Sequence, residues 1–171
     1  MRKIATLAFA AALAGCGAAP RAGAEAPQGA APRTGAEAPV LRHVNPSTLP
    51  APRGYSHVVE ARRGRSIYIS GQIALDRSGK LVGAGDFRAQ TEQVFTNLRA
   101  ALAAVGADFT HVVKLNFYVT ELDDAHLGAL REVRDRYIDP THPPASSLVQ
   151  VVRLVRPELV VEIDAIAVVA D

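Results

Sequence analysis

A regular apolar stripe after residue 86 limits the folds open to this chain more than any other feature. The members of the stripe recur at spacings of three and four residues: Phe87, Thr91, Val94, Phe95, Leu98, Leu102 and Val105. This spacing predicts an amphipathic helix with one buried face. Asp86 is suited to cap the start of this helix, and Gly106 is suited to end it.

The other elements are predicted from alternation and from turn residues. Residues 111–119 alternate between two faces, with Val113, Leu115, Phe117 and Val119 on one and Val112, Lys114, Asn116 and Tyr118 on the other. Further strands are predicted at residues 57–61, 66–74, 146–154 and 159–169, and a second helix at 124–137. The order ββ(β)αβαββ predicts an α+β fold with two helices on one face of a mixed sheet.

The N-terminus has the pattern of an export signal. Arg2 and Lys3 precede an apolar run that is too short to span a bilayer, and Leu13-Ala14-Gly15-Cys16 closes the run. The last four residues resemble a bacterial lipobox, which implies a lipoprotein signal peptide at residues 1–15 and acylation of Cys16. The expected location is therefore a bacterial membrane, on the periplasmic side or at the cell surface. An ordinary signal peptide, or a hydrophobic start with a chance cysteine, is the alternative.

Residues 16–52 are rich in alanine, proline and glycine, and they contain a near-repeat. Residues 19–27 recur with one substitution as residues 31–39. A segment with so few large apolar groups is expected to be a disordered linker, and its prolines make it an extended spacer. The folded domain is then predicted to cover residues 53–171.

Composition excludes several classes of function. The 19 basic and 17 acidic side chains nearly balance, which argues against nucleic acid as the main partner. The single cysteine excludes an intramolecular disulfide and a zinc site made of cysteines. The five histidines have no metal-ligand or catalytic-triad spacing, and Gly83-Ala84-Gly85 lacks the third glycine of a phosphate loop. Neither a metal nor another cofactor is expected.

Three short motifs, in order, carry a family resemblance. They are residues 70–74 (SGQIA), residues 144–147 (PASS) and residues 161–165 (VEIDA). In this order they resemble the Rid family, also called the YjgF family, of reactive-intermediate deaminases. The resemblance implies a chorismate-mutase-like fold and a homotrimer with clefts between subunits. It also implies hydrolysis of a small 2-imino or enamine acid to the keto acid and ammonia, without a cofactor.

The resemblance also assigns candidate site residues. Glu162 matches the carboxylate that orients or activates water, and Tyr55 matches a tyrosine that lines the cleft, so both are candidate catalytic residues. The candidate substrate-binding residues are Gln72, Ser146, Leu148 and Asp164. Strand alternation places Glu162 and Asp164 on the same face.

Ser146 departs from the family pattern. Deaminase-active members have an arginine at this position, which grips the substrate carboxylate, and losing such a charged pair costs roughly 2–5 kcal/mol of binding. Arg153 is expected on the opposite face of the strand, whereas Arg88, Arg134 or Arg156 could reach the cleft across a trimer interface. Two functions stay open: an imine or enamine hydrolase, and a non-catalytic ligand-binding or interaction module on the same scaffold. A serine hydrolase built on Ser146 and Ser147 lacks a suitably placed histidine.

Overall fold

The computed structural model describes residues 39–171 of the chain. The predicted signal peptide, the acylation site at Cys16 and most of the predicted linker lie outside the described residues. The elements are β1 (Val40–Val44), β2 (Val58–Arg62), β3 (Arg65–Ile73), α1 (Phe87–Ala103), a 3₁₀ turn (Phe109–His111), β4 (Val112–Val119), α2 (Asp124–Arg134), β5 (Ala145–Gln150) and β6 (Val161–Val169).

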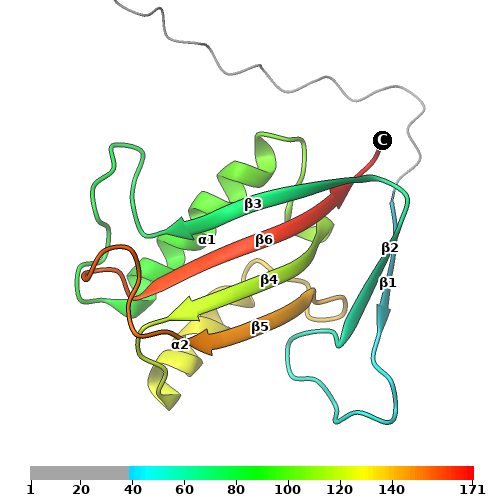
Figure 1. The fold of residues 1–171 in the computed structure, drawn as a ribbon, viewed down its shortest axis with the longest axis horizontal. Helices are drawn as coiled ribbons and strands as arrows, with labels where there is room; N and C mark the ends of the chain where they lie inside the picture. The colour runs from blue at the N-terminus through cyan, green and yellow to red at the C-terminus, as the bar shows by residue number, and fades with distance from the viewer. Residues whose placement is uncertain (1–38) are drawn as a thin grey trace, which may run out of the picture.

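The main sheet has four strands in the order β3-β6-β4-β5. Strand β6 pairs antiparallel with β3 and with β4, and β5 pairs parallel with β4. The strands face the viewer in Figure 1, and both helices lie behind them. Strands β1 and β2 form a separate antiparallel pair beside the sheet. The prediction of an α+β fold, with two helices on one face of a mixed sheet, is confirmed.

The core lies between the sheet and α1. Phe95, Leu98 and Leu102 on α1 are fully buried, as are Ile163 and Val161 on β6. The predicted cap is present, because the Asp86 side chain accepts a hydrogen bond from the Ala89 backbone N–H at 3.0 Å. The predicted stripe is right up to residue 102. Val105 falls after the helix end and is 40% exposed.

A bulge in β4 corrects the predicted alternation of this strand. The pairing of β4 with β6 shifts register between Val112 and Lys114. The extra residue returns Val112 to the helix side of the sheet, where it is buried. Strict alternation had predicted Val112 on the face that does not carry Leu115. The residues from 114 to 119 then alternate as predicted.

Several element ends also differ from the predictions. The ordered region begins earlier than composition indicates, because Val40–Val44 pairs with β2 inside the stretch expected to be linker. Helix α2 ends at Arg134 and β5 ends at Gln150, both short of the predicted ends. Tyr137 lies beyond α2, yet its ring stacks on Phe95 with centroids 4.9 Å apart.

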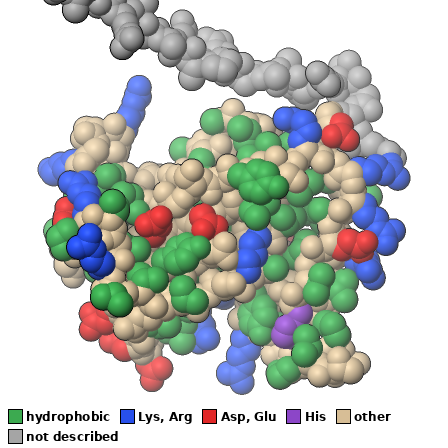
Figure 2. Space-filling model, in the orientation of Figure 1, with side chains coloured by type: hydrophobic (Ala, Val, Ile, Leu, Met, Phe, Trp, Pro, Cys, Tyr) green, Lys and Arg blue, Asp and Glu red, His purple; other side chains and the backbone are tan. Residues whose placement is uncertain are grey.

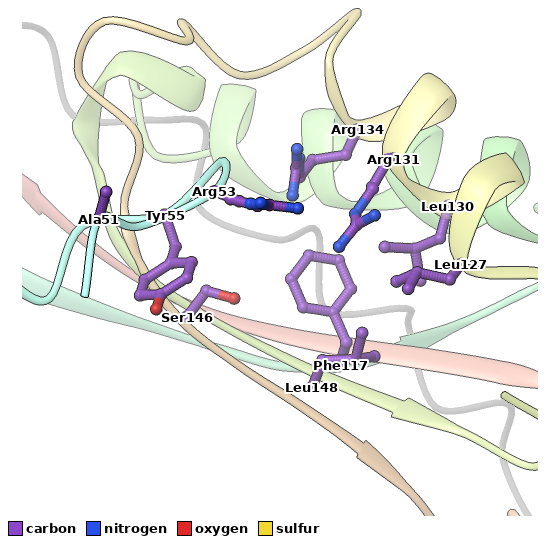
Figure 3. Close-up of a pocket in the computed structure, with 10 residues that line it drawn as sticks. All are labelled: Ala51, Arg53, Tyr55, Phe117, Leu127, Leu130, Arg131, Arg134, Ser146 and Leu148. Atoms are coloured by element: carbon purple, nitrogen blue, oxygen red, sulfur yellow. The ribbon is translucent and has the colours of Figure 1, made fainter. Parts of the chain in front are cut away.

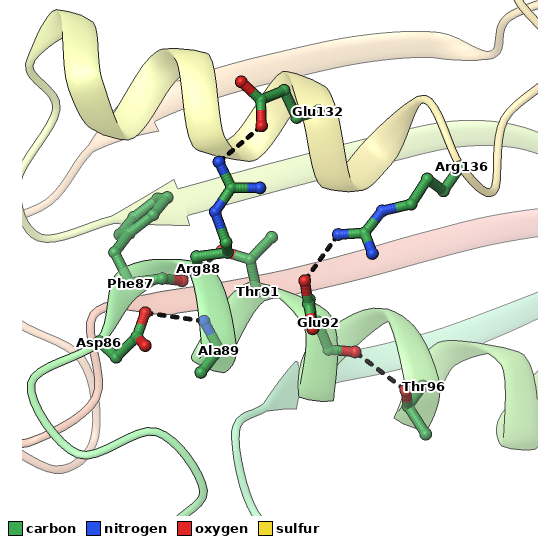
Figure 4. A network of polar contacts seen from close by, with 9 residues as sticks. All are labelled: Asp86, Phe87, Arg88, Ala89, Thr91, Glu92, Thr96, Glu132 and Arg136. Carbon is green, nitrogen blue, oxygen red and sulfur yellow. Dashed lines mark hydrogen bonds and ion pairs between the residues drawn. The ribbon is translucent and has the colours of Figure 1, made fainter.

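The two helices are joined by ion pairs on their outer sides. Arg88 on α1 pairs with Glu132 on α2 at 2.6 Å, and Glu92 on α1 pairs with Arg136 just after α2, also at 2.6 Å (Figure 4). The four side chains are between 43% and 66% exposed, so each pair stabilises the fold only slightly. Arg88 and Arg136 are therefore bound to acidic side chains on the helices, away from the sheet.

Replacing Phe95 with alanine tests the packing of α1 on the sheet. The ring is fully buried and contacts the rings of Phe109, Phe117 and Tyr137. We expect Phe95→Ala to lower the free energy of unfolding by about 3–5 kcal/mol in urea denaturation. Val152→Ala is the control, because Val152 is 99% exposed. A loss below about 1 kcal/mol for Phe95→Ala would contradict the described core.

Candidate functional site

A cavity of about 380 Å³ opens between α2 and the sheet. Figure 3 shows the residues that line it, which come from the segment before β2, from β4, from β5 and from α2. They are Ala51, Arg53, Tyr55, Phe117, Leu127, Leu130, Arg131, Arg134, Ser146 and Leu148. We call this the α2 pocket.

Helix and strand periods together place the walls of the α2 pocket. The wall on the helix side comes from one face of α2, whose residues recur at spacings of three and four: Leu127, Leu130, Arg131 and Arg134. The parallel pairing of β4 and β5 sets Ser146 beside Leu115 and Leu148 beside Phe117. Because Leu115 and Phe117 point toward the helices, Ser146 and Leu148 point to the same side.

Tyr55 is held beside Ser146 by its neighbour Ser56. The buried Ser56 donates from its backbone N–H to the carbonyl of Pro144 at 3.0 Å and from its hydroxyl to the carbonyl of Pro143 at 2.7 Å. These bonds tie the segment before β2 to the start of β5. Three of the residues singled out from the sequence, Tyr55, Ser146 and Leu148, therefore share one pocket.

Three arginines also line the α2 pocket. Arg134 was considered from the sequence only as a contribution from a neighbouring subunit, whereas here it lines the pocket of its own chain. Arg53 and Arg131 were missed. The signal for Arg131 was the helical spacing of α2, which sets it next to Leu127 and Arg134. The sequence held no comparable signal for Arg53, which depends on how the segment before β2 folds back.

Arg134 is committed to local structure. Its guanidinium pairs with Asp135 at 2.7 Å, and its side chain is only 14% exposed. It packs against Gly54, where a β-carbon would overlap the guanidinium and where φ is +74°. Glycine at position 54 therefore provides both the turn and the space for Arg134.

The other arginines considered from the sequence lie away from the α2 pocket. Arg88 pairs with Glu132, and Arg156 pairs with Glu158 at 3.0 Å. Arg153 is exposed and follows the end of β5. None of the three lines the α2 pocket.

Glu162 and Asp164 lie on the opposite face of the sheet from the α2 pocket. They alternate along β6 with Val161, Ile163 and Ala165, which are buried on the helix side. We call this helix-free side the open face, and Figure 2 shows acidic side chains near its middle. The sequence prediction that Glu162 and Asp164 share a face agrees with this alternation.

Asp164 is the centre of a small polar network on the open face. Its carboxylate accepts hydrogen bonds from the Asn116 side-chain amide at 2.8 Å and from the Tyr118 hydroxyl at 3.0 Å. The hydrogen bond to Asp164, together with the negative charge of this carboxylate, raises the pKa of Tyr118 above its ordinary value. Asp164 therefore holds its neighbours in place.

Glu162 lies against the backbone of Gly71. A β-carbon at residue 71 would overlap the Glu162 carboxylate, which shows how closely this side chain approaches β3. Strand β3 also shifts register between Ile69 and Gln72 at this point. The glycine of the SGQIA motif thus makes room for the candidate catalytic carboxylate.

Gln72 lies apart from both groups. It pairs with Ile163, so it points to the helix side, where it lines a shallow hollow with Asn97 and Ala100 on α1. Its side-chain amide donates to the Ser70 carbonyl at 3.1 Å. The structure therefore separates the predicted site residues into the α2 pocket, the open face and this hollow.

The chemistry within the α2 pocket is incomplete in a single chain. None of the ten residues described as lining it is a carboxylate or a histidine. Within this set, Tyr55 and Ser146 are the uncharged side chains that carry a hydroxyl able to take part in proton transfer. Within residues 39–171, no cluster of three histidine, cysteine or acidic side chains could hold a metal ion. No helix in the same region is long and apolar enough to cross a bilayer.

Comparison with known proteins decides the family. The family model described as endoribonuclease L-PSP matches residues 46–169, and this is the YjgF, RutC or Rid group. The chain belongs to the Rid family. The crystal structure of a Rid-family protein of unknown function, YyfB from Yersinia pestis, has a TM-score of 0.70 and 39% identity. The matched region covers 75% of this chain and 98% of the YyfB chain.

Curated Rid relatives differ in what their names state. Protein DfrA of Myxococcus xanthus is 45% identical over 114 residues, which are 67% of this chain and 84% of that protein. A mouse protein named 2-iminobutanoate/2-iminopropanoate deaminase is 39% identical over 126 residues, which are 71% of this chain and 88% of that protein.

The network around Asp164 gives a pH prediction. Because the pKa of Tyr118 is raised, its phenol stays protonated at pH values where a free tyrosine ionises. The hydrogen bond between Tyr118 and Asp164 therefore makes its whole contribution to the stability of the fold below pH 10.0. This contribution is lost as the pH rises through the raised pKa of Tyr118. Tyrosinate absorbance, compared between the wild-type protein and Tyr118→Phe, isolates this group. Asp164→Asn is expected to shift its titration to lower pH, and an unchanged titration would contradict the network.

Proposed function

We propose that this protein hydrolyses a small, reactive 2-imino acid, or its enamine form, to the keto acid and ammonia. The observation that carries the proposal is that each face of the sheet holds one half of a site. One is an apolar pocket with arginines, Tyr55 and Ser146, and the other is a carboxylate, Glu162, held over Gly71. Relatives named as 2-iminobutanoate/2-iminopropanoate deaminases support it.

The proposed reaction needs only positioning and proton transfer. The carbon of the protonated imine is electrophilic, so a water held by Glu162 attacks it while the carboxylate accepts a proton from that water. The resulting carbon bears a hydroxyl and an amino group. Glu162 then gives this proton to the amino group, and ammonia leaves while the hydroxyl returns a proton to Glu162 and its C–O bond becomes the carbonyl. The Tyr55 and Ser146 hydroxyls line the pocket side of the proposed cleft.

The two incomplete sites can meet only between copies of the chain. The α2 pocket and Glu162 lie on opposite faces of one sheet, so no side-chain rotation brings them together. We therefore propose a homotrimer, as the family resemblance implies, in which the Glu162 of one copy faces the pocket of the next. The exposed Tyr68, which lies on the open face with 78% of its surface accessible, fits a face that is covered on assembly.

One observation favours a second candidate function. Ser146 is neutral, so the α2 pocket lacks the arginine at this position that the family uses for a substrate carboxylate. A ligand-binding module that keeps the trimeric cleft but has lost the reaction would have this feature. The two functions differ in whether Glu162 matters for turnover.

Hydrolysis of freshly generated 2-iminobutanoate, followed by ammonia release, tests the proposed reaction. We expect turnover above the spontaneous rate, and Glu162→Gln should lower it about 10²- to 10⁴-fold because the general base is lost. Glu121→Gln, in an exposed loop, is the matched control. Equal turnover by wild type and Glu162→Gln would refute the role of Glu162. Absence of turnover from a folded wild-type oligomer would favour the binding module.

We further propose that acylated Cys16 tethers the domain to a bacterial membrane. The lipobox and the basic residues before it support this, and several acyl chains give stable anchoring at about 0.8 kcal/mol per buried CH₂. In a bacterial host, Cys16→Ser should move the protein from the membrane fraction to a soluble fraction. An unchanged membrane fraction for this variant would contradict a lipid anchor.

A further inference from the structure

Two of the three arginines in the α2 pocket form no ion pair with an acidic side chain within residues 39–171. Arg134 is paired with Asp135, but no ion pair or hydrogen bond joins Arg53 or Arg131 to another side chain in the described part of the chain. Both side chains are exposed at the mouth of the cavity. The pocket therefore presents two uncompensated positive charges.

The direction of these groups is as important as their charge. The guanidinium groups of Arg53, Arg131 and Arg134 gather along one side of the cavity in Figure 3. Like charges that converge repel one another, and an anion placed between them removes the repulsion and accepts charge-assisted hydrogen bonds. Arginine is suited to a carboxylate because its planar fork can bind both oxygens.

The rest of the cavity is apolar. Phe117 and Leu148 form its sheet side, and Leu127 and Leu130 form part of its helix side. The volume of about 380 Å³ lies in the range of about 300–1,000 Å³ that holds ligands larger than a four-carbon acid. Such walls suit a branched or aromatic hydrocarbon chain, which gains free energy from leaving water.

We propose that Arg53 and Arg131 bind the ligand carboxylate, in place of the arginine that is absent at position 146. The ligand class is then a 2-imino acid, or its 2-oxo product, with a branched or aromatic apolar side chain. This inference rests on the proposed function for the imine group, but the carboxylate site itself follows from the pocket. Ser146 lies across the cavity from the arginines, next to Tyr55, which leaves the space between them for the ligand (Figure 3).

Equilibrium binding to the full chain tests the carboxylate site without requiring catalysis. Calorimetric titration with 4-methyl-2-oxopentanoate and with phenylpyruvate should give tighter binding than titration with 2-oxobutanoate. Arg53→Gln and Arg131→Gln should each weaken the binding about tenfold, because each removes a charged hydrogen-bond donor. Arg136→Gln is the matched control, since Arg136 follows α2 but pairs with Glu92 outside the pocket, and its affinity should stay within about twofold.

Three results would overturn the inference. One is equal affinity for 4-methyl-2-oxopentanoate and its neutral amide. The second is tighter binding of inorganic phosphate with the same dependence on Arg53 and Arg131, which would assign the site to a phosphate ester. The third is undiminished binding by both arginine variants, whose thermal unfolding should match wild type because both side chains are exposed.

Turnover separates this inference from the proposed function. Binding that depends on Arg53 and Arg131, in a protein that releases no ammonia from the imine of 4-methyl-2-oxopentanoate, would keep the carboxylate site and refute the enzyme. Ammonia release that neither variant impairs would keep the enzyme and refute the carboxylate site.

Discussion

The alternation of side chains along β6 is the constraint on which the rest of the structure depends. This strand lies between β3 and β4, so its register is fixed on both sides by backbone hydrogen bonds. Burial of Val161, Ile163 and Ala165 under the helices allows only one orientation of the strand. Glu162 and Asp164 are consequently directed to the open face, because a shift of one residue would bury both carboxylates in the core.

This arrangement explains why polar chemistry occurs in two places. The side that carries the helices also carries the α2 pocket, whose arginines and aliphatic residues suit binding. The open face carries Glu162 and the network around Asp164, which suit proton transfer and its support. Neither place alone can bind a carboxylate substrate and activate water, so the proposed function depends on the contact between copies of the chain.

The sequence predicted the parts that depend on local periodicity. The helix that begins after Asp86 and the placement of Glu162 and Asp164 on one face both follow from residue spacing. The bulge after Val112 was not predictable, because it depends on pairing with β6. Strand β1 was missed because its proline- and alanine-rich flank resembles linker. Arg53 was missed because it reaches the α2 pocket only when Ser56 binds to the carbonyls of Pro143 and Pro144.

Complementation between two inactive variants tests most directly whether one site is shared by two copies. Glu162→Gln removes the carboxylate, and Leu148→Trp fills the α2 pocket. Refolding them as an equal mixture should restore about one quarter of wild-type turnover, because random assembly into a ring places an intact pocket beside an intact Glu162 at about one site in four. No recovery of turnover in verified mixed oligomers would contradict a site shared by two copies.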